Sequence, residues 1–347
     1  MSERRFFIDR SVGETRGVVL LDGRPERLFV QRDGEDRSVG AGAQAVVRVR
    51  KIDKALGTAF LELPGGAPAI LPLRAEDGPL TVGQAISIEI KTEARRDKAA
   101  VARFLEAGEG APRLLKPAPD VAELLALLAK DAPIVEGGAA RDAADQAEAE
   151  AMEVVHGLPG GGRVSIEPTR ALVAIDIDVG DRPGAESKRV TREANLSGLA
   201  AAARLLRLKG LGGLVAIDLA GRGHDGAALL NAARIAFGPD NPGVAFGPIS
   251  RFGVLELTAP RRQRPVLDTL LDENGAPSAQ TLALRLARAI EREGRKAGGA
   301  RLKAACAPAV AAAFAPLRTG LAAKLGERFT VEARADWAPA RQEVWAE

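Results

Sequence analysis

Two stretches of the sequence share the tetrapeptide VAID, and each places an aspartate at the end of an apolar run. Residues 171–181 read ALVAIDIDVGD and residues 212–220 read GGLVAIDLA, so Asp176 and Asp218 both follow strand-forming residues. Aspartate is depleted in strands, and a carboxylate is costly to bury without a partner. The repeated aspartate therefore points to a chemical role at the ends of two strands.

The segment between the two copies predicts a β-helix-β unit. Residues 194–209 carry apolar positions at helical spacing, and Gly210 follows as a C-cap. Strands joined in this way usually run parallel in one sheet, with their ends side by side. Strand alternation puts Asp176 and Asp178 on one face, and Asp218 arrives from the neighbouring strand. Three carboxylates this close stay ionised only if a cation lies between them.

The ligand types favour a hard cation. The chain has one cysteine and two histidines, so we expect an all-oxygen site for Mg²⁺, with Mn²⁺ as the second candidate, at Asp176, Asp178 and Asp218. Such a cation suits phosphodiester hydrolysis, because it lowers the pKa of a bound water and neutralises charge on the phosphate. An aspartate at a strand end can also cap a turn or the next helix, and this remains the alternative for each residue taken singly.

Composition limits the class of protein. The 347 residues suffice for roughly two to four domains, and 46% hydrophobic with 27% charged residues is typical of a globular protein. No apolar run approaches the roughly 20 residues of a membrane helix. The N-terminus MSERRFFIDR also lacks a secretory signal. We therefore expect a cytoplasmic protein that does not contact the membrane, and the single cysteine excludes an internal disulfide.

Charge is nearly balanced overall at +3, but the segment from Arg251 to Lys303 holds eleven basic and six acidic residues. This local excess suits a phosphate backbone. A solvated helix face explains it equally well. Tyrosine is absent and aromatic residues make up 3% of the chain, so any base stacking depends on a few phenylalanines.

Short alternating segments with Gly/Pro turns predict two β-rich regions, residues 5–32 and 44–104, the second of them a small barrel. Residues 105–118 are Gly/Pro-rich and are expected to form a linker. In the C-terminal part, Ser278 is a predicted N-cap for a helix that runs through Lys296. A second helix and one final strand, ERFTVEARADW, are expected after it.

With these motifs the sequence resembles the ribonuclease E/G family. The stretches that carry the resemblance are GGRVSIEPTRALVAIDID, EANLSGLAAAARLLRLKGLGGLVAIDLA and ISRFGVLEL. They occur in the family in this order and at nearly this spacing. The N-terminal part matches more loosely, through GTAFLELPGGAPAILPL, and the C-terminal part resembles the family's small domain.

The resemblance implies an α+β multidomain fold: an OB-fold β-barrel inserted in an RNase H-like remnant, a DNase I-like α/β catalytic subdomain and a small C-terminal α/β domain. The expected boundaries are 1–35 and 108–155 for the RNase H-like remnant with its linker, 36–107 for the OB fold, 156–262 for the catalytic subdomain and 263–347 for the small domain.

The resemblance also implies a Mg²⁺-dependent endoribonuclease that cleaves single-stranded RNA in RNA processing or decay and leaves 5′-phosphate and 3′-hydroxyl ends. The family's two metal-holding catalytic aspartates fall on Asp176 and Asp218. Asp178 stands where the family usually has asparagine, and it still offers an oxygen to the metal.

RNA contacts are expected outside the aspartates as well. Arg251 matches the arginine of the ISRFG motif, where it could meet a phosphate or form a structural ion pair. Phe60 matches an RNA-stacking aromatic of the OB fold, although a phenylalanine at this place can equally belong to the barrel core. Ile70 stands at the second stacking position. Phe60, Lys98 and Arg251 form the predicted RNA-binding set.

Two family features are missing. The paired-cysteine segment that binds zinc between protomers should follow LTAPRRQRP, but VLDTLLDENG stands there. The segment between barrel and catalytic core is also short, and the part that senses a 5′-monophosphate is absent. We therefore expect no structural zinc, and a homo-oligomer without a zinc link. Two alternatives stay open: an RNA-binding protein of the same descent with little or no nuclease activity, and a Mg²⁺ phosphoesterase for small substrates. The RNA and its cleavage preference are not encoded in these motifs.

Overall fold

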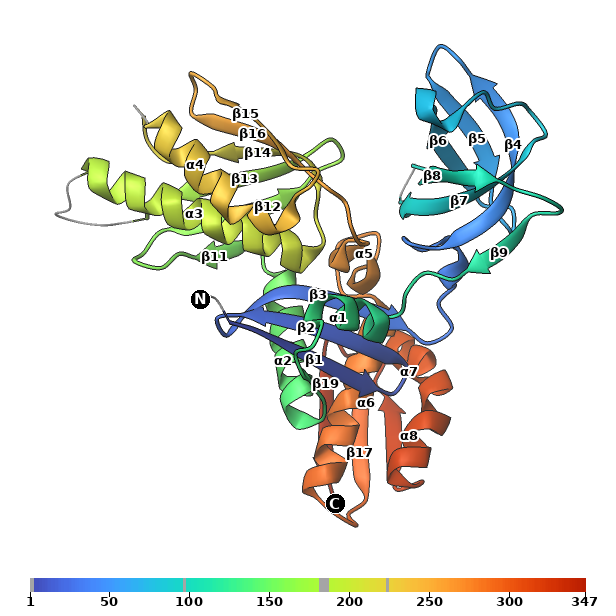
Figure 1. Ribbon diagram of the computed structural model, residues 1–347. Helices are drawn as coiled ribbons and strands as arrows, with labels where there is room; N and C mark the ends of the chain where they lie inside the picture. Colours follow the sequence, from blue (N-terminus) through green and yellow to red (C-terminus); the bar gives the residue numbers. More distant parts are fainter. Residues whose placement is uncertain (1–2, 96–97, 181–186, 223–224) are drawn as a thin grey trace.

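The computed structural model describes residues 3–95, 98–180, 187–222 and 225–347. Within these residues the chain folds into a mixed α+β, multidomain arrangement with four β-sheets. The barrel stands apart from the central sheet, and the N-terminal sheet lies between them and the C-terminal part (Figure 1).

The N-terminal sheet has the order β10-β1-β2-β3 and carries one helix on each face. Its elements are β1 (Arg4–Ser11), β2 (Glu14–Leu21), β3 (Arg24–Arg32), β10 (Ile134–Val135), α1 (Val121–Ala129) and α2 (Gly138–Met152). Alternation along β1 sends Phe6 toward α1 and Phe7 toward the alanines of α2. The hairpin turn predicted between β2 and β3 is confirmed, with Asp22 and Gly23 both at positive φ.

The barrel predicted over residues 44–104 is confirmed as a closed, OB-like sheet of five strands, because β4 pairs with both β5 and β7. Its elements are η1 (Arg37–Val39), β4 (Gln44–Asp53), β5 (Thr58–Glu62), β6 (Pro68–Pro72), η2 (Ala75–Asp77), β7 (Ala85–Thr92) and β8 (Ala100–Ala107). The linker expected over 105–118 is shorter than predicted. Arg113–Lys116 forms a sixth strand, β9, because it finds backbone partners on β4.

The central sheet has the order β11-β12-β13-β14-β16-β15, and α3 and α4 cover one of its faces (Figure 1). Its elements are β11 (Val155–Gly157), β12 (Arg163–Pro168), β13 (Val173–Asp178), α3 (Ser187–Lys209), β14 (Gly213–Asp218), α4 (Gly226–Ala236), η3 (Gly238–Asp240), β15 (Ala245–Ile249) and β16 (Val254–Ala259). β13 and β14 run parallel and flank α3 in sequence. The predicted β-helix-β unit is therefore confirmed, including the positive φ of Gly210.

The C-terminal part is built on a three-stranded sheet of order β18-β17-β19. Its elements are α5 (Val266–Leu270), α6 (Ala279–Lys296), β17 (Leu302–Cys306), α7 (Pro308–Phe314), η4 (Ala315–Leu317), α8 (Arg318–Leu325), β18 (Phe329–Ala333) and β19 (Gln342–Ala346). The N-cap at Ser278 is confirmed, since its hydroxyl accepts from Thr281 N. The strand expected in ERFTVEARADW is confirmed as β18, but the expectation of only one helix and one strand after α6 is wrong, because β17, a second helix and β19 are also present. β17 (LKAAC) is too short and Ala-rich to show strand periodicity.

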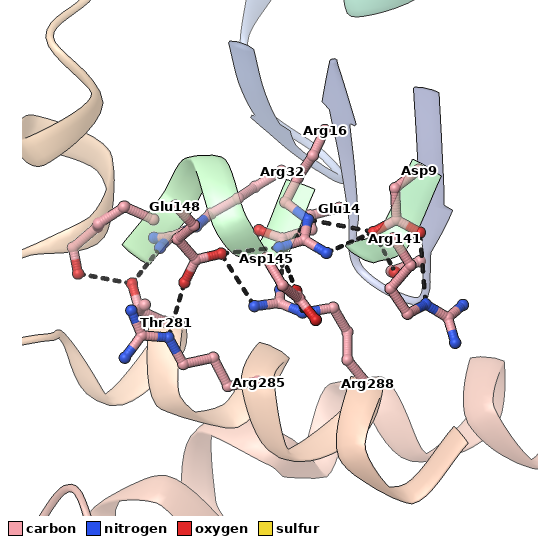
Figure 2. A network of polar contacts seen from close by, with 12 residues as sticks. Asp9, Glu14, Arg16, Arg32, Arg141, Asp145, Glu148, Thr281, Arg285 and Arg288 are labelled. Atoms are coloured by element: carbon pink, nitrogen blue, oxygen red, sulfur yellow. Dashed lines mark hydrogen bonds and ion pairs between the residues drawn. The ribbon is translucent and has the colours of Figure 1, made fainter. Parts of the chain in front are cut away.

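A buried ion network joins the N-terminal sheet to α2 and α6 (Figure 2). Arg16 of β2 is completely buried and donates to Asp9 at 2.6 Å and to Glu148 of α2 at 2.9 Å. From α6, Arg288 contacts Glu148 at 3.0 Å and also pairs with Glu14. The network therefore fixes α6, the long helix of the C-terminal part, onto the first strands of the chain.

This network also accounts for part of the excess of basic residues between Arg251 and Lys303. Arg285, Arg288 and Arg292 of α6 are paired with acidic residues of α2 and β2. Much of the positive charge on α6 is therefore neutralised inside the fold and does not form a surface for a polyanion.

Candidate active site

The two VAID aspartates are direct neighbours. In the parallel pair of β13 and β14, Asp176 lies opposite Asp218. Along β13 the side chains of Val173, Ile175 and Ile177 are buried, whereas Asp176 is exposed. Because α3 and α4 cover the buried face, both carboxylates lie on the open face of the sheet, at the carboxyl ends of the two strands.

Electrostatics distinguishes this pair from ordinary surface carboxylates. Partial burial raises the pKa of Asp176, and the nearby carboxylates of Asp218 and Asp178 raise it further. A cation between the two strand ends would remove this repulsion. Among the described residues, no cluster of three or more His, Cys, Asp or Glu side chains could by itself hold a metal ion. The pair nevertheless fits Mg²⁺, which is usually held by one or two carboxylates, with waters and substrate phosphate completing its shell.

Asp178 has partners of its own. Arg163 on β12 donates to Asp178 Oδ2 at 2.8 Å, and the backbone N–H of Gly180 donates to Oδ1 at 2.9 Å. The hydrogen bond from Gly180 and then that from Arg163 lower the pKa of Asp178. Its role as a third metal ligand stays a prediction, and it would require this carboxylate to share its oxygens with Arg163.

Arg251 lies at the same edge of the sheet. It belongs to the turn between β15 and β16. Val254, three residues after Arg251, pairs with Asp218. The turn is also tied to β14, because Leu219 N donates to Gly253 O at 3.1 Å. The guanidinium of Arg251 lies 4.6 Å from the ring centroid of Phe252, whose position next to Arg251 was not given a role from the sequence.

In the barrel, Phe60 on β5 pairs directly with Ile70 on β6. Both side chains are half-buried on the outer face, whereas their neighbours Ala59 and Leu61 lie in the barrel core. Lys51 Nζ lies 5.6 Å from the Phe60 ring centroid. Phe60 is therefore not a core residue, and the outer face of the barrel presents one aromatic ring beside one lysine.

Lys98 lines a cavity of about 1080 Å³ between the barrel and the central sheet. On the side of the sheet, the cavity is lined by Val173, the first residue of β13, and by Gly212, which directly precedes β14. Asp176 and Asp218 lie instead toward the C-terminal ends of these two strands. The barrel and the Asp pair thus lie at opposite ends of strands that are about 20 Å long. The sequence motifs gave no indication of this separation.

Two further cations of this cavity were also missed. Arg95 and Arg261 both line it. Burial and then the proximity of Arg95 lower the pKa of Arg261. Within the described part of the chain, no side-chain hydrogen bond or ion pair engages either guanidinium. Only the fold brings these arginines together, since they come from different domains.

The single thiol is unsuited to a zinc site. Cys306 ends β17 in the C-terminal core, and burial raises the pKa of its thiol. A structural zinc site needs about four N/S ligands. We therefore expect the purified protein to retain less than half a zinc per chain after dialysis, measured by elemental analysis. Stoichiometric zinc would contradict the prediction.

One further finding concerns the membrane. Of the helices in the described residues, none combines the length and the apolar character needed to cross a bilayer.

Comparisons with known proteins agree with the motifs around the aspartates. The model of the ribonuclease E/G family matches residues 112–264. Ribonuclease E of Haemophilus influenzae is 37% identical over 107 residues, which are 30% of this chain and 11% of that protein. Ribonuclease E of Escherichia coli is 36% identical over 107 residues, 30% of this chain and 10% of that protein. A chloroplastic ribonuclease E/G-like protein of Arabidopsis thaliana is 30% identical over 121 residues, 33% of this chain and 12% of that protein.

The match thus covers about a tenth of the length of each curated relative. The match of the family model, residues 112–264, includes both VAID strands, the helix between them and the turn that carries Arg251. Residues 112–264 of this chain are thus similar to the ribonuclease E/G family, and the similarity to named relatives is confined to about a third of the chain.

Proposed function

We propose that this protein is a Mg²⁺-dependent endoribonuclease of the ribonuclease E/G type. It cleaves single-stranded RNA in the cytoplasm, in RNA processing or decay, and leaves 5′-phosphate and 3′-hydroxyl ends. The observation that carries the proposal is the direct pairing of Asp176 with Asp218 on the open face of the central sheet. Relatives named ribonuclease E, each similar to about 30% of this chain, support the choice of reaction and substrate.

Each residue then has a defined role. Asp176 and Asp218 hold Mg²⁺ or Mn²⁺, and Asp178 offers a further oxygen. The bound ion supplies a water of lowered pKa and neutralises charge on the scissile phosphate. Arg251 binds a phosphate from the adjacent turn, since a guanidinium can donate two parallel hydrogen bonds to it. Phe60 and Lys98 hold the RNA strand farther away, on the barrel and at the cavity beside it.

The same proposal assigns the subdomains. The N-terminal sheet with α1 and α2 is the RNase H-like remnant, the closed barrel is the inserted OB fold, and the central sheet with α3 and α4 is the DNase I-like catalytic subdomain. Because β9 pairs with β4, the OB fold extends to Lys116. A homo-oligomer, if formed, is held without a zinc link.

One observation favours a second candidate, an RNA-binding protein with little or no nuclease activity. Arg163 holds the carboxylate of Asp178, the residue that stands where the family has asparagine. Ile70 at the second stacking position also weakens the barrel as a clamp for substrate. A phosphoesterase for small substrates is less consistent with the fold, because a small substrate needs no barrel for strand binding.

The deciding experiment incubates a single-stranded RNA, labelled at one end, with the protein in Mg²⁺ and in EDTA. Internal cleavage in Mg²⁺ that stops in EDTA is the expected result, with products that accept ligation at their 5′-phosphates. Tight RNA binding without cleavage under both conditions would favour the binding protein instead.

Cleavage is expected to be indifferent to the 5′ end of the RNA. Sensing a terminal monophosphate needs a pocket of donors around all its oxygens. Residues 105–160 contain four cations and neither serine nor threonine. Of these cations, Arg141 is buried against Glu291, and Arg113 donates to a backbone carbonyl.

The test compares initial rates on one RNA with a 5′-monophosphate, a 5′-triphosphate or a 5′-hydroxyl. Rates within about threefold are expected, which is less than about 1 kcal/mol in transition-state binding. A preference of about tenfold or more for the monophosphate would contradict the prediction. Arg95 and Arg261, in the cavity beside the barrel, would then be the first residues to replace.

A further inference from the structure

Phe252 stands out among the aromatic residues. The ten phenylalanines and two tryptophans all lie in the part of the chain that the structure describes, and of these side chains Phe252 alone is exposed, at 75%. An isolated exposed apolar residue needs no explanation by its exposure alone. Its position beside the Asp pair, and the way it is held there, make it different.

The turn that carries Phe252 is fixed to the active edge of the sheet. Ser250 N donates to Val254 O at 2.9 Å, and Gly253 N donates to Ser250 O at 3.0 Å. A further hydrogen bond reaches the residue directly after β14, where Leu219 N donates to Gly253 O. Gly253 has φ +90°, a conformation that favours glycine. The backbone of the turn is therefore specified from both sides.

This placement sets the distance to the metal-holding residues. Val254 lies opposite Asp218, and Phe252 precedes Val254 by two residues, in the turn. Two residues of chain span at most about 7 Å and paired Cα atoms lie about 5 Å apart, so the Cα atoms of Phe252 and Asp218 are no more than about 12 Å apart. An aromatic ring at this range can meet a base that neighbours a phosphate bound at the aspartates.

A contact with Arg251 restrains the ring of Phe252 in this position. Its guanidinium lies 4.6 Å from the ring centroid, a cation–π arrangement that restrains Phe252 without burying it. A ring with 75% exposure and one face against an arginine retains an open face for a second planar group. Unpaired nucleobases are such groups, and stacking on an aromatic side chain tolerates any base because each has a π-face.

We infer that Phe252 is a stacking platform for one unpaired nucleobase of single-stranded RNA, next to the phosphate that meets Asp176 and Asp218. This inference rests on the proposed function for its substrate class, and it adds a base-binding site to the metal site and the barrel. Because stacking does not depend on the identity of the base, the site fixes the position of the strand without selecting a sequence.

The experiment pairs variants of the protein with RNAs that lack a single base at successive positions around the cleavage site. Phe252→Ala removes the ring, and Phe252→Trp keeps a stacking surface. Leu127→Ala is the matched control, since Leu127 is 71% exposed on α1 and distant from the sheet edge. Two readouts are used: kcat/KM in Mg²⁺, and the dissociation constant in EDTA, where no metal-dependent turnover occurs.

On intact RNA, Phe252→Ala is expected to weaken binding and kcat/KM about 5- to 150-fold, the effect of losing one base–aromatic stack. On the RNA that lacks the stacked base, Phe252→Ala and the wild-type protein should become equal. Phe252→Trp should stay near wild type, and Leu127→Ala should change nothing. Unchanged melting temperatures confirm that the variants fold.

Two results would overturn the inference. One is a change of less than about twofold on intact RNA in both readouts. The other is an equal loss on every abasic RNA. Failure of the proposed function would give a different result. If the protein binds RNA and Phe252→Ala weakens this binding in EDTA, but no cleavage occurs, the stacking site is supported and the nuclease activity is refuted. A protein that neither binds nor cleaves RNA loses both.

Discussion

Replacing Asp176 or Asp218 by asparagine is expected to lower the rate of RNA cleavage about 1,000-fold or more, while the affinity for RNA stays within about threefold. Asparagine keeps the shape of the side chain but removes the charge that holds the cation. A thousandfold loss corresponds to about 4 kcal/mol of transition-state stabilisation, a reasonable share for a metal that activates water and neutralises phosphate. Affinity persists because it comes from phosphate contacts and from the barrel.

The matched control is Glu167→Gln. Glu167 is exposed on β12, and it pairs with Ala174, two residues before Asp176 on the same face of the sheet. The control therefore removes one negative charge from this face without touching the pair. Cleavage is measured with saturating Mg²⁺, and binding is measured separately in EDTA. Normal cleavage by either aspartate variant would refute the assignment of the active site.

The sequence was sufficient for this pair because both signals are local. Apolar periodicity predicts β13, α3 and β14, and the parallel pairing that is usual for β-helix-β units then puts the two strand ends side by side. Capping is equally local, which explains why the start of α6 at Ser278 is also correct. These predictions need only a few neighbouring residues and general rules of chain geometry.

The features that the sequence did not predict depend on contacts between distant segments. Whether Arg163 faces Asp178 is decided by the register of β12 against β13. The position of the barrel at the far end of the central strands depends on how whole domains pack. The short strands β17 and β19 gain their stability from a shared sheet, which no local pattern reveals.

The partners of Arg16 illustrate the same limit. Asp9 stands in the stretch FFIDR, where the local sequence gives no sign of a buried charged partner. It is, however, 3% exposed and bonded to Arg16, which also reaches Glu148, 132 residues away. Nothing near Asp9 in the sequence specifies that contact.

Removal of this arginine is expected to cause the largest loss of stability in the chain. Arg16→Met should lower the free energy of unfolding by about 3–5 kcal/mol, because it leaves buried carboxylates without their counter-charge. Asp9 and Glu148 are both nearly inaccessible to water, and burial already raises the pKa of Glu14 despite the nearby Arg288 and Arg16. Arg334→Met is the matched control, because Arg334 pairs with Glu332 on the surface, where an ion pair contributes little.

The loss should also depend on pH. Although burial opposes ionisation, the charged partners of Asp9 and Glu148, chiefly Arg16 and Arg288, hold the pKa of each carboxyl below its ordinary value. A lowered pKa contributes stability that is present above the ordinary pKa and is lost as the pH falls through the lowered one. Arg16→Met removes that contribution, so the difference between variant and wild type should be fully present near pH 7 and should shrink below about pH 4, as the pH falls through the lowered pKa values.

The measurement follows unfolding in urea by the fluorescence of Trp337 and Trp345, the two tryptophans of the chain. Both belong to the C-terminal part, which α6 joins to Arg16 through Arg288 and Glu148. The signal therefore reports on the part of the molecule that the network holds in place. If Arg16→Met shifts the urea midpoint no more than Arg334→Met does, or if its effect grows as the pH is lowered, then the network does not stabilise this junction as argued.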